Sequence, residues 1–289
     1  MLKKVMVTCL LSSAMSVSVF AANFADDFEG AVKLMNSGKY AEAQEAFVKL
    51  SEVAPTPQSG DDALAYATRS ASAQKKFDEA FAIAAKIKDV SLSKKWRMEI
   101  MLADFKSPDL IKEFKDEDIG AWPEKIAFDG FFKRGFAYMV TGDGVKAAAD
   151  LEKAVEKGLT PDQKVAAAEM LGNVYMSQVK DDEKALAAFA VAEKFQLNGR
   201  SSFMGSLINA SVILTKQGKF DEALAKLNII DQKQAFEYWK ANIIASYGDV
   251  YAAKGDKAQA SVKYKEAMAV EKAPKSLLDA IQTKLDAVK

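Results

Sequence analysis

Small, aromatic and other apolar residues recur in a fixed order along the chain, with a period of roughly 36 residues. Each copy has a small residue, an aromatic residue three positions later, a turn that contains Gly, and then Ala, a large apolar residue and Ala. The clearest copies start at Gly135-x-x-Tyr138 and Gly248-x-x-Tyr251, and a third starts at Gly172 with one extra residue in its turn. Such self-similarity predicts stacked helical units that bury a core only together.

Weaker copies fill most of the remaining sequence. They are marked by Gly38 with Phe47, by Phe77 with Ala80, and by Gly218 with Phe220. The segment 94–123 lacks the Ala and Gly anchors, yet the interval between its neighbours has room for one more helical pair. We therefore count about seven repeats, with six as the alternative.

The residue types suggest how the two helices of one unit meet. Antiparallel helices approach closely only where small residues face each other, so we expect Gly135, Gly172 and Gly248 to lie opposite Ala147, Ala185 and Ala260. Gly in the turn supplies a helix C-cap with positive φ. Carboxylates near the starts of the second helices are expected to cap free amides and complement the helix dipole: Asp143, Asp181, Asp221 and Asp256.

The last segment, 275–289, follows Pro274 and carries apolar residues on one side only, among them Leu277, Ile281 and Leu285. This spacing predicts an amphipathic helix that caps the end of the repeat array.

The repeated positions resemble those of the tetratricopeptide repeat (TPR) family, and the resemblance extends over nearly all of 22–274. It implies an all-α fold, a right-handed α-solenoid of about seven TPR-like hairpins with a C-terminal capping helix, in which the unit at 94–123 is degenerate. The stretch from Tyr247 onward also has a faint similarity to the last repeat of bacterial ancillary translocon-subunit-type periplasmic TPR proteins.

The N-terminus has the pattern of a secretory signal peptide. Lys3 and Lys4 precede an uncharged apolar stretch over 5–20, and Ala21 lies where a signal peptidase would cut. We predict a signal peptide at 1–21 and an exported protein, periplasmic or extracellular, without stable membrane insertion. An uncleaved anchor is the alternative, although the stretch is shorter than the roughly 20 residues of a membrane span.

The amino-acid composition excludes several catalytic mechanisms. The protein has no His and a single Cys, Cys9, which lies within the predicted signal. His-dependent triads and thiolate nucleophiles are therefore excluded from the mature protein, and no phosphate-binding or nucleophile-elbow motif occurs. We predict no enzyme, no cofactor and no metal site. The alternative is a carboxylate-dependent hydrolase of cell-wall polymer on a helical framework, which would need two carboxylates facing one groove.

Charge points to protein partners. The sequence has 40 basic and 40 acidic residues, so losing Lys3 and Lys4 leaves 38 basic residues against 40 acidic ones. Nucleic-acid binding depends on clustered Lys and Arg, which are absent from this pattern. We predict a scaffold or chaperone-like holder for other proteins or peptides, and a homo-oligomer is a third hypothesis.

The resemblance also implies where a partner binds, because TPR proteins use the first helix of each hairpin. In the first unit the matching positions are Phe28, Val32 and Met35; in the later units they include Phe132, Phe136, Met139, Glu169, Asn173, Met176, Ile208 and Val212. The Lys/Asn clamp with which the family grips the C-termini of its partners is not reproduced. We expect a partly apolar groove for a peptide or partner helix, with packing between repeats as the alternative role of these residues.

Overall fold

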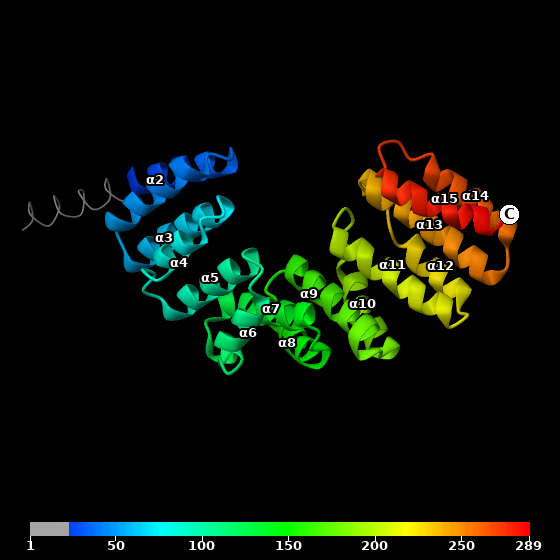
Figure 1. Ribbon diagram of the computed structural model, residues 1–289, viewed down its shortest axis with the longest axis horizontal. Coiled ribbons are helices and arrows are strands. Elements are labelled where there is room, and N and C mark those ends of the chain that lie inside the picture. The colour runs from blue at the N-terminus through cyan, green and yellow to red at the C-terminus, as the bar shows by residue number, and fades with distance from the viewer. Residues whose placement is uncertain (1–22) are drawn as a thin grey trace, which may run out of the picture. The chain divides into compact units, whose positions relative to one another are not determined.

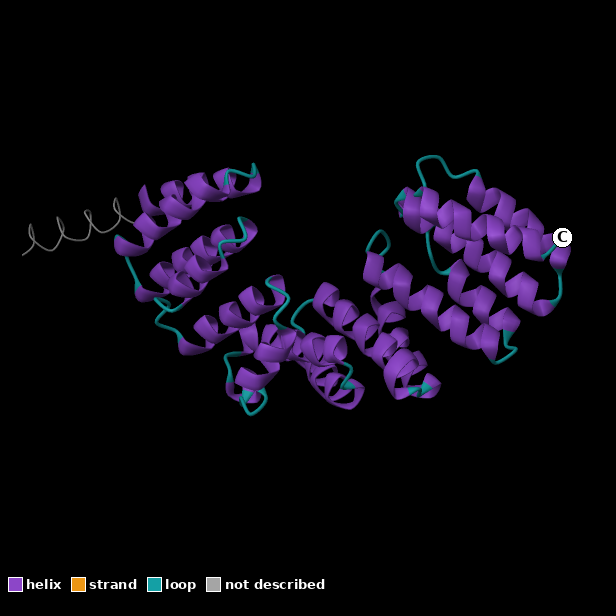
Figure 2. Ribbon diagram, viewed as in Figure 1, coloured by secondary structure: helices purple, strands orange, loops and turns teal. Residues whose placement is uncertain are grey.

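The computed structural model describes residues 23–289, and within that range it contains helices and loops only, as Figure 2 shows. The predicted signal peptide at 1–21 lies outside the described residues. The protein divides into two compact units, one ending at Ile126 and the other spanning Ala127–Lys289. The prediction of an all-α fold of helical hairpins is confirmed.

The first unit is built from three consecutive helical hairpins. Its first helix covers 23–36 in the described part. The helices that follow are α2 (Tyr40–Glu52), α3 (Pro57–Ala73), α4 (Phe77–Ala84), α5 (Val90–Ala103) and α6 (Ser107–Phe114), with a short 3₁₀ turn at Ile119–Ala121. The last hairpin, α5 with α6, forms over much of the segment whose repeat pattern is most degraded.

The second unit contains four hairpins and a terminal helix, all labelled in Figure 1. Its helices are α7 (Glu124–Thr141, which starts just before the unit boundary), α8 (Gly144–Lys157), α9 (Pro161–Val174), α10 (Asp182–Phe195), α11 (Ser201–Lys216), α12 (Phe220–Asn228), α13 (Glu237–Lys254), α14 (Lys257–Met268) and α15 (Lys275–Ala287). The odd-numbered helices α9, α11 and α13 contact one another in sequence, so first helices pack against first helices.

Every hairpin turn contains one residue in the left-handed region. Gly occupies it in four hairpins and other residues in three: Gly38, Lys75, Phe105, Gly142, Lys180, Gly218 and Gly255. In six turns the next residue donates its N–H to the carbonyl five positions back, for example Asp143 to Tyr138 at 2.9 Å. This is the Schellman arrangement that ends a helix. The predicted positive-φ C-cap is therefore present even where Gly is not.

The extra residue in the third copy is absorbed by a change of helix type. Residues Tyr175–Val179 continue α9 as a π-helix, and Lys180 follows with φ +64°. Here Asp181 donates its N–H to the carbonyl of Tyr175, six positions back, instead of the usual five. After this wider turn α10 starts at Asp182 with Asp181 at its N-cap, as α8 starts after Asp143.

Small residues face large ones inside a hairpin, which corrects the expected pairing of Gly with Ala. A Cβ placed on Gly172 would overlap the Phe189 ring, and one on Gly248 would lie 2.5 Å from the Tyr264 ring. The partner is one helical turn beyond the expected Ala, because helical side chains point toward the N-terminus of their own helix and so cover the turn before them. Ala185 and Ala260 are fully buried beside these rings.

Three of the four predicted carboxylate caps are confirmed. Asp143, Asp181 and Asp256 accept the backbone N–H three residues on, at 2.9–3.2 Å. The predicted cap at Asp221 is wrong, because α12 starts two residues earlier than such a cap requires, with Lys219 at the N-cap and no side-chain bond there. Asp221 instead lies in the first turn, where it favours the helix dipole.

The terminal helix α15 closes the second unit. Ile281 and Leu285 are 1% and 5% exposed, and they belong to a cluster with Ile244, Ala245 and Tyr264. The outward side of α15 is polar, as a capping helix requires. Among the helices of residues 23–289, none combines the length and the apolar composition that crossing a bilayer demands.

Candidate functional site

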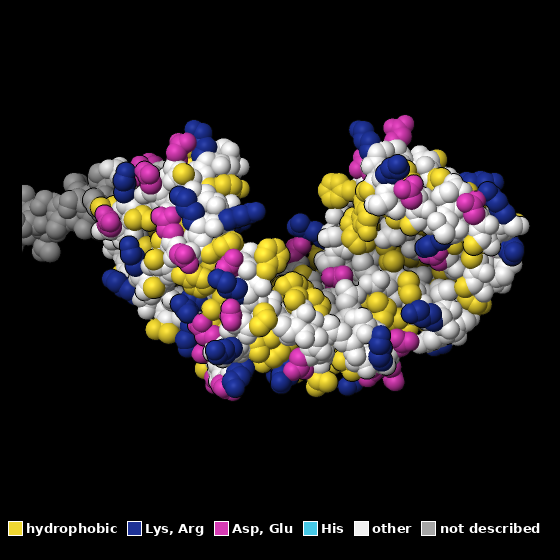
Figure 3. Space-filling model, in the orientation of Figure 1, with side chains coloured by type: hydrophobic (Ala, Val, Ile, Leu, Met, Phe, Trp, Pro, Cys, Tyr) yellow, Lys and Arg dark blue, Asp and Glu magenta, His cyan; other side chains and the backbone are white. Residues whose placement is uncertain are grey.

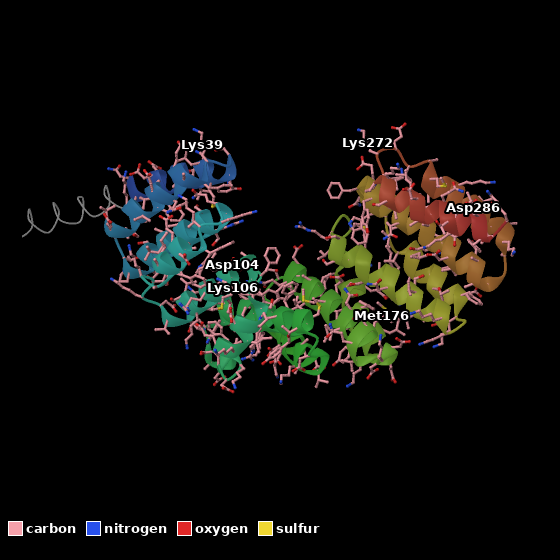
Figure 4. All side chains as sticks on the ribbon, in the orientation of Figure 1. Lys39, Asp104, Lys106, Met176, Lys272 and Asp286 are labelled. Atoms are coloured by element: carbon pink, nitrogen blue, oxygen red, sulfur yellow. The ribbon has the colours of Figure 1, made fainter. Side chains whose placement is uncertain are left out.

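The first helices of the second unit leave one side accessible. We call the half-buried and exposed side chains on this side of α7, α9, α11 and α13 the first-helix face. Its members are Phe132, Phe136, Met139, Glu169, Asn173, Met176, Asn209, Val212 and Trp239. Met176, labelled in Figure 4, lies in the π-helical turn after α9.

In the first unit, two of the three candidates take part in packing. The Phe28 ring lies 5.2 Å from the ring centroids of both Phe47 and Tyr66, so it fills the space between two hairpins. Met35 is only 7% exposed. Val32 is half-buried and has no such ring contact. In the first unit Phe28 and Met35 thus serve packing, whereas Val32 stays half-buried without such a contact.

In the second unit, the α7 candidates keep accessible surface. Phe132 stacks on Phe128 with ring centroids 5.4 Å apart, and it is half-buried, as are Phe136 and Met139. The carbonyl of Met139 accepts a hydrogen bond from the Gln178 side chain at 2.8 Å, which ties α7 to the π-helical turn. This pair of Phe residues and Met139 forms an apolar surface on α7.

A polar relay connects α9 to α11. The Asn173 amide donates to Glu169 Oε1 at 2.9 Å, and the Asn209 amide donates to Asn173 Oδ1 at 2.7 Å. A carboxylate only accepts, so it fixes Asn173 as the donor in the first bond and as the acceptor in the second. The predicted residue Asn173 is therefore held in one orientation by partners on two helices.

Gly205 on α11 brings two further groups together. A Cβ at this position would lie 3.1 Å from Glu169 Oε1 and 3.6 Å from Trp239 Cη2. Because both atoms lie within 4 Å of that one point, the carboxylate of α9 and the indole of α13 are neighbours across α11. Trp239 also meets Tyr238 edge-on at 5.5 Å.

The two α11 candidates differ in exposure. Ile208 is 7% exposed and belongs to the core cluster of the unit, so it is a packing residue. Val212 is 36% exposed and lines a shallow hollow of about 160 Å³ together with Thr215 of the same helix and Ser246 of α13. Only Val212 of this pair is therefore available to a partner.

Glu169 differs from most other carboxylates of the unit in its pKa and in its hydrogen-bond partners. Burial raises the pKa of the Glu169 carboxyl, and only the bond from Asn173 acts in the opposite direction. Many other carboxylates of the unit are bonded to cations, for example Asp150 to Arg134, Glu193 to Lys226 and Asp249 to Lys284. Within residues 23–289, no Lys or Arg forms an ion pair with Glu169. Its negative charge is thus compensated by amides alone.

The rest of the surface is mixed in charge. Figure 3 shows Lys and Arg side chains interspersed with Asp and Glu over the visible face of each unit. A larger hollow, of about 530 Å³, lies between the start of α13 and the end of α14, and it carries both signs, from Lys233, Lys240, Glu266 and Lys272 among others. No group of three or more Cys, Asp or Glu side chains suited to a metal ion occurs in the described part of the protein.

The sequence did not reveal Asn209, Gly205 and Trp239. When the repeats are aligned on their turns, Val212 of α11 takes the position equivalent to Asn173 of α9. In space the two helices cross, so Asn173 contacts Asn209, which lies about one helical turn before Val212. The one available signal was the recurrence of Asn on the accessible side of successive first helices, because Asn is an unusual choice within a helix.

The comparisons with known proteins agree with this geometry. Residues 206–289 match the family model of the tetratricopeptide repeat-like domain. No curated protein matches the sequence. Among solved structures, pilF of Pseudomonas aeruginosa is 12% identical with a TM-score of 0.52, covering 92% of this chain and 99% of its own. The C-terminal part of a TPR repeat-containing protein from Cytophaga hutchinsonii is 17% identical with a TM-score of 0.55, covering 87% and 98%.

These similarities define the class by its fold, a helical-repeat protein built from hairpins of tetratricopeptide-repeat type. Residues 206–289 are the part of the chain that matches the family model of the tetratricopeptide repeat-like domain. Proteins of this family are typically scaffolds rather than enzymes. Identities of 12% and 17% carry the fold alone.

Proposed function

We propose that this protein is a non-enzymatic scaffold or chaperone-like holder of the cell envelope, and that it binds a polypeptide segment along the first-helix face. The observation that carries the proposal is the accessible apolar surface of α7 and α9, where Phe132, Phe136, Met139 and Met176 are all half-buried and lie on first helices. Large apolar side chains left partly exposed in a group mark interaction sites.

The chemistry of these residues suits a polypeptide with varied side chains. Met is unbranched and polarizable, so it adapts to different apolar partners, and Phe supplies a broad contact surface. The relay through Asn173 and Asn209 adds oriented polar groups beside this surface. An amphipathic helix or an extended segment fits such a mixed groove.

Site-specific photo-crosslinking in the cell tests the proposal. A photoreactive residue is placed at Phe132, Phe136 or Val212, and matched controls carry it at Val145 and Val262, which are 74% and 55% exposed on second helices. We expect discrete crosslinked products with other polypeptides from the first three positions and none from the controls. Phe132→Ser with Phe136→Ser should abolish the product obtained from position 212.

Two outcomes would contradict this function. Equal crosslinking from both sides of the hairpins would mean that the first-helix face is not selective. Crosslinks only between copies of this protein would favour the homo-oligomer, and light scattering at several concentrations would then show association.

Export is a separate part of the proposal, and the sequence at 1–21 supports it. N-terminal sequencing of the protein recovered from the cell envelope should start at Ala22. A protein that retains Met1 and stays with the membrane fraction would favour the uncleaved anchor.

A further inference from the structure

Glu169 is built into the first-helix face with an incomplete set of partners. The Asn173 amide occupies one site on Oε1, and neither the second oxygen nor Oδ1 of Asn209 has a bond from another described residue. Both side chains are half-buried rather than buried. The face therefore presents acceptors and a negative charge, which calls for a cationic donor.

The surroundings of Glu169 favour a cation with an apolar stem. Gly205 is buried and has no side chain, so the Glu169 carboxylate can lie close to α11, and the Trp239 indole edge lies against the same point. An indole face attracts a guanidinium or an ammonium group, and it also packs against the methylenes that carry one. Tyr238, which is 46% exposed, extends the aromatic surface beside it.

An anionic or purely apolar occupant fits these atoms less well. A second carboxylate would repel Glu169, and an apolar group would leave its charge without compensation. Such a charge is costly to cover, because a buried ion needs a partner or hydrogen bonds. Salt-bridged carboxylates elsewhere in the unit, such as Glu193 with Lys226 at 2.6 Å, show the arrangement that Glu169 lacks.

We propose that Glu169 and Trp239 form a subsite for a basic side chain, arginine or lysine, of the polypeptide held by the first-helix face. This inference rests on the proposed function and adds a charge requirement to it. Arginine fits both elements at once, since its planar guanidinium can stack on the indole while its N–H groups reach the carboxylate.

The test uses the full mature protein and two small probes, N-acetyl-arginine amide and its neutral analogue N-acetyl-citrulline amide. The indole N–H signals of the three Trp residues are followed by NMR at about pH 8, where a carboxyl group is ionised. We expect the arginine probe to shift one indole signal saturably, and Trp239→Phe identifies that signal by its loss. The citrulline probe should bind at least about tenfold more weakly.

Two variants separate the subsite from general electrostatics. Glu169→Gln keeps an acceptor for Asn173 and removes the charge, and it should weaken the arginine probe at least about tenfold. Glu237→Gln removes an exposed charge two residues from Trp239, and it should change binding less than about twofold because surface charges are screened.

Equal binding of the two probes, an unchanged affinity in Glu169→Gln, or no saturable shift of the Trp239 signal would overturn the inference. Partner crosslinking from positions 132 and 136 would persist in that case, and the proposed function would stand. Loss of the crosslinks with an intact arginine site would instead reject the proposed function.

Discussion

Gly172 shows how closely the two helices of one hairpin approach. The Phe189 ring occupies the space where a Cβ would be, whereas nothing lies within 4 Å of a Cβ built on Gly30. Both residues lie within helices, so they differ in crowding rather than in backbone conformation.

Gly172→Ala should therefore lower the free energy of unfolding by about 1–3 kcal/mol, because Phe189 must shift in a closely packed core. Gly30→Ala is the matched control, and it should raise stability by about 0.5–1 kcal/mol through helix propensity. Urea unfolding followed by circular dichroism measures both. A similar change in the two variants would mean that crowding at Gly172 is unimportant.

Glu169 makes stability depend on pH. Burial raises the pKa of its carboxyl above the unfolded value of 4.5, so the folded state favours the neutral form. The protein is therefore most stable, as far as this group is concerned, below the unfolded pKa, where the carboxyl is neutral in both states. This contribution to the free energy of unfolding is lost as the pH rises through the higher folded pKa. Ionised Glu169 consequently costs stability at neutral pH.

Glu169→Gln should be more stable than the parent protein at pH 8, and the difference should disappear as the pH falls toward 4.5. Thermal unfolding of both proteins across this pH range measures the effect. A difference that grows on acidification would show that Glu169 is stabilised by an unrecognised cation.

At the scale of elements, the hairpin turns combine one backbone geometry with different residues. Phe105 has φ +58° and is 93% exposed, while Gly142 holds the same position in another hairpin with φ +86° and nothing near its Cβ site. A non-Gly residue pays about 1–2 kcal/mol for this conformation. Substitutions at these two positions therefore report the free-energy cost of positive φ, without contacts from neighbouring side chains.

Gly142→Ala should destabilise the protein by about 1 kcal/mol, and Phe105→Gly should stabilise it by about 0.5 kcal/mol once the greater freedom of the unfolded state is included. Chemical denaturation gives both values. Loss of stability in Phe105→Gly would indicate that the exposed ring has a packing partner.

The capping helix makes a second prediction at this scale. Ile281→Ala should cost about 2–5 kcal/mol, because Ile281 is 1% exposed and its loss leaves a cavity against Ile244 and Tyr264. Asp279→Ala, on the outward side of α15, should change stability by less than about 0.5 kcal/mol. Equal effects would mean that α15 does not cap the core.

Several elements could be predicted from the sequence because their cause is local. The amphipathic spacing of 275–289 predicted α15, and Gly142 and Gly255 marked the turns before α8 and α14. The π-helix at Tyr175–Val179 and the contact of Gly172 with Phe189 could not be predicted, because both depend on how two helices meet in space.

At the scale of the whole molecule, the division into two units after Ile126 was not expected. A repeat pattern specifies contacts between neighbours only, so it does not say where an array is interrupted. The degraded pattern at 94–123 and Pro123 at its end lie just before this boundary.

The candidate site was predicted only in outline. Asn173 and Val212 were named from their place in the repeat, and they lie on the accessible side of α9 and α11. Ile208 follows the same pattern and is buried, since burial depends on the neighbouring helix rather than on the repeat position. The proximity of Glu169 to Trp239 could not be predicted, because the two residues are 70 positions apart in sequence (169 to 239).

The amino-acid composition gives one prediction for the whole molecule. Cys9 is the only Cys and lies within the predicted signal peptide, so the mature protein has no disulfide to reduce. Its thermal unfolding temperature should be the same with and without dithiothreitol. A shift would show that Cys9 is retained and forms a bond between two copies.

The common geometry of the hairpin turns has an evolutionary consequence. Because Gly218 and Gly255 both follow a first helix with positive φ, +73° and +86°, we expect the stretch between them to behave as an exchangeable module. Duplication or loss of such a module rejoins two helices through an unaltered bend. A lineage that carries this gene can therefore lengthen or shorten its protein by whole hairpins, without redesigning the joints.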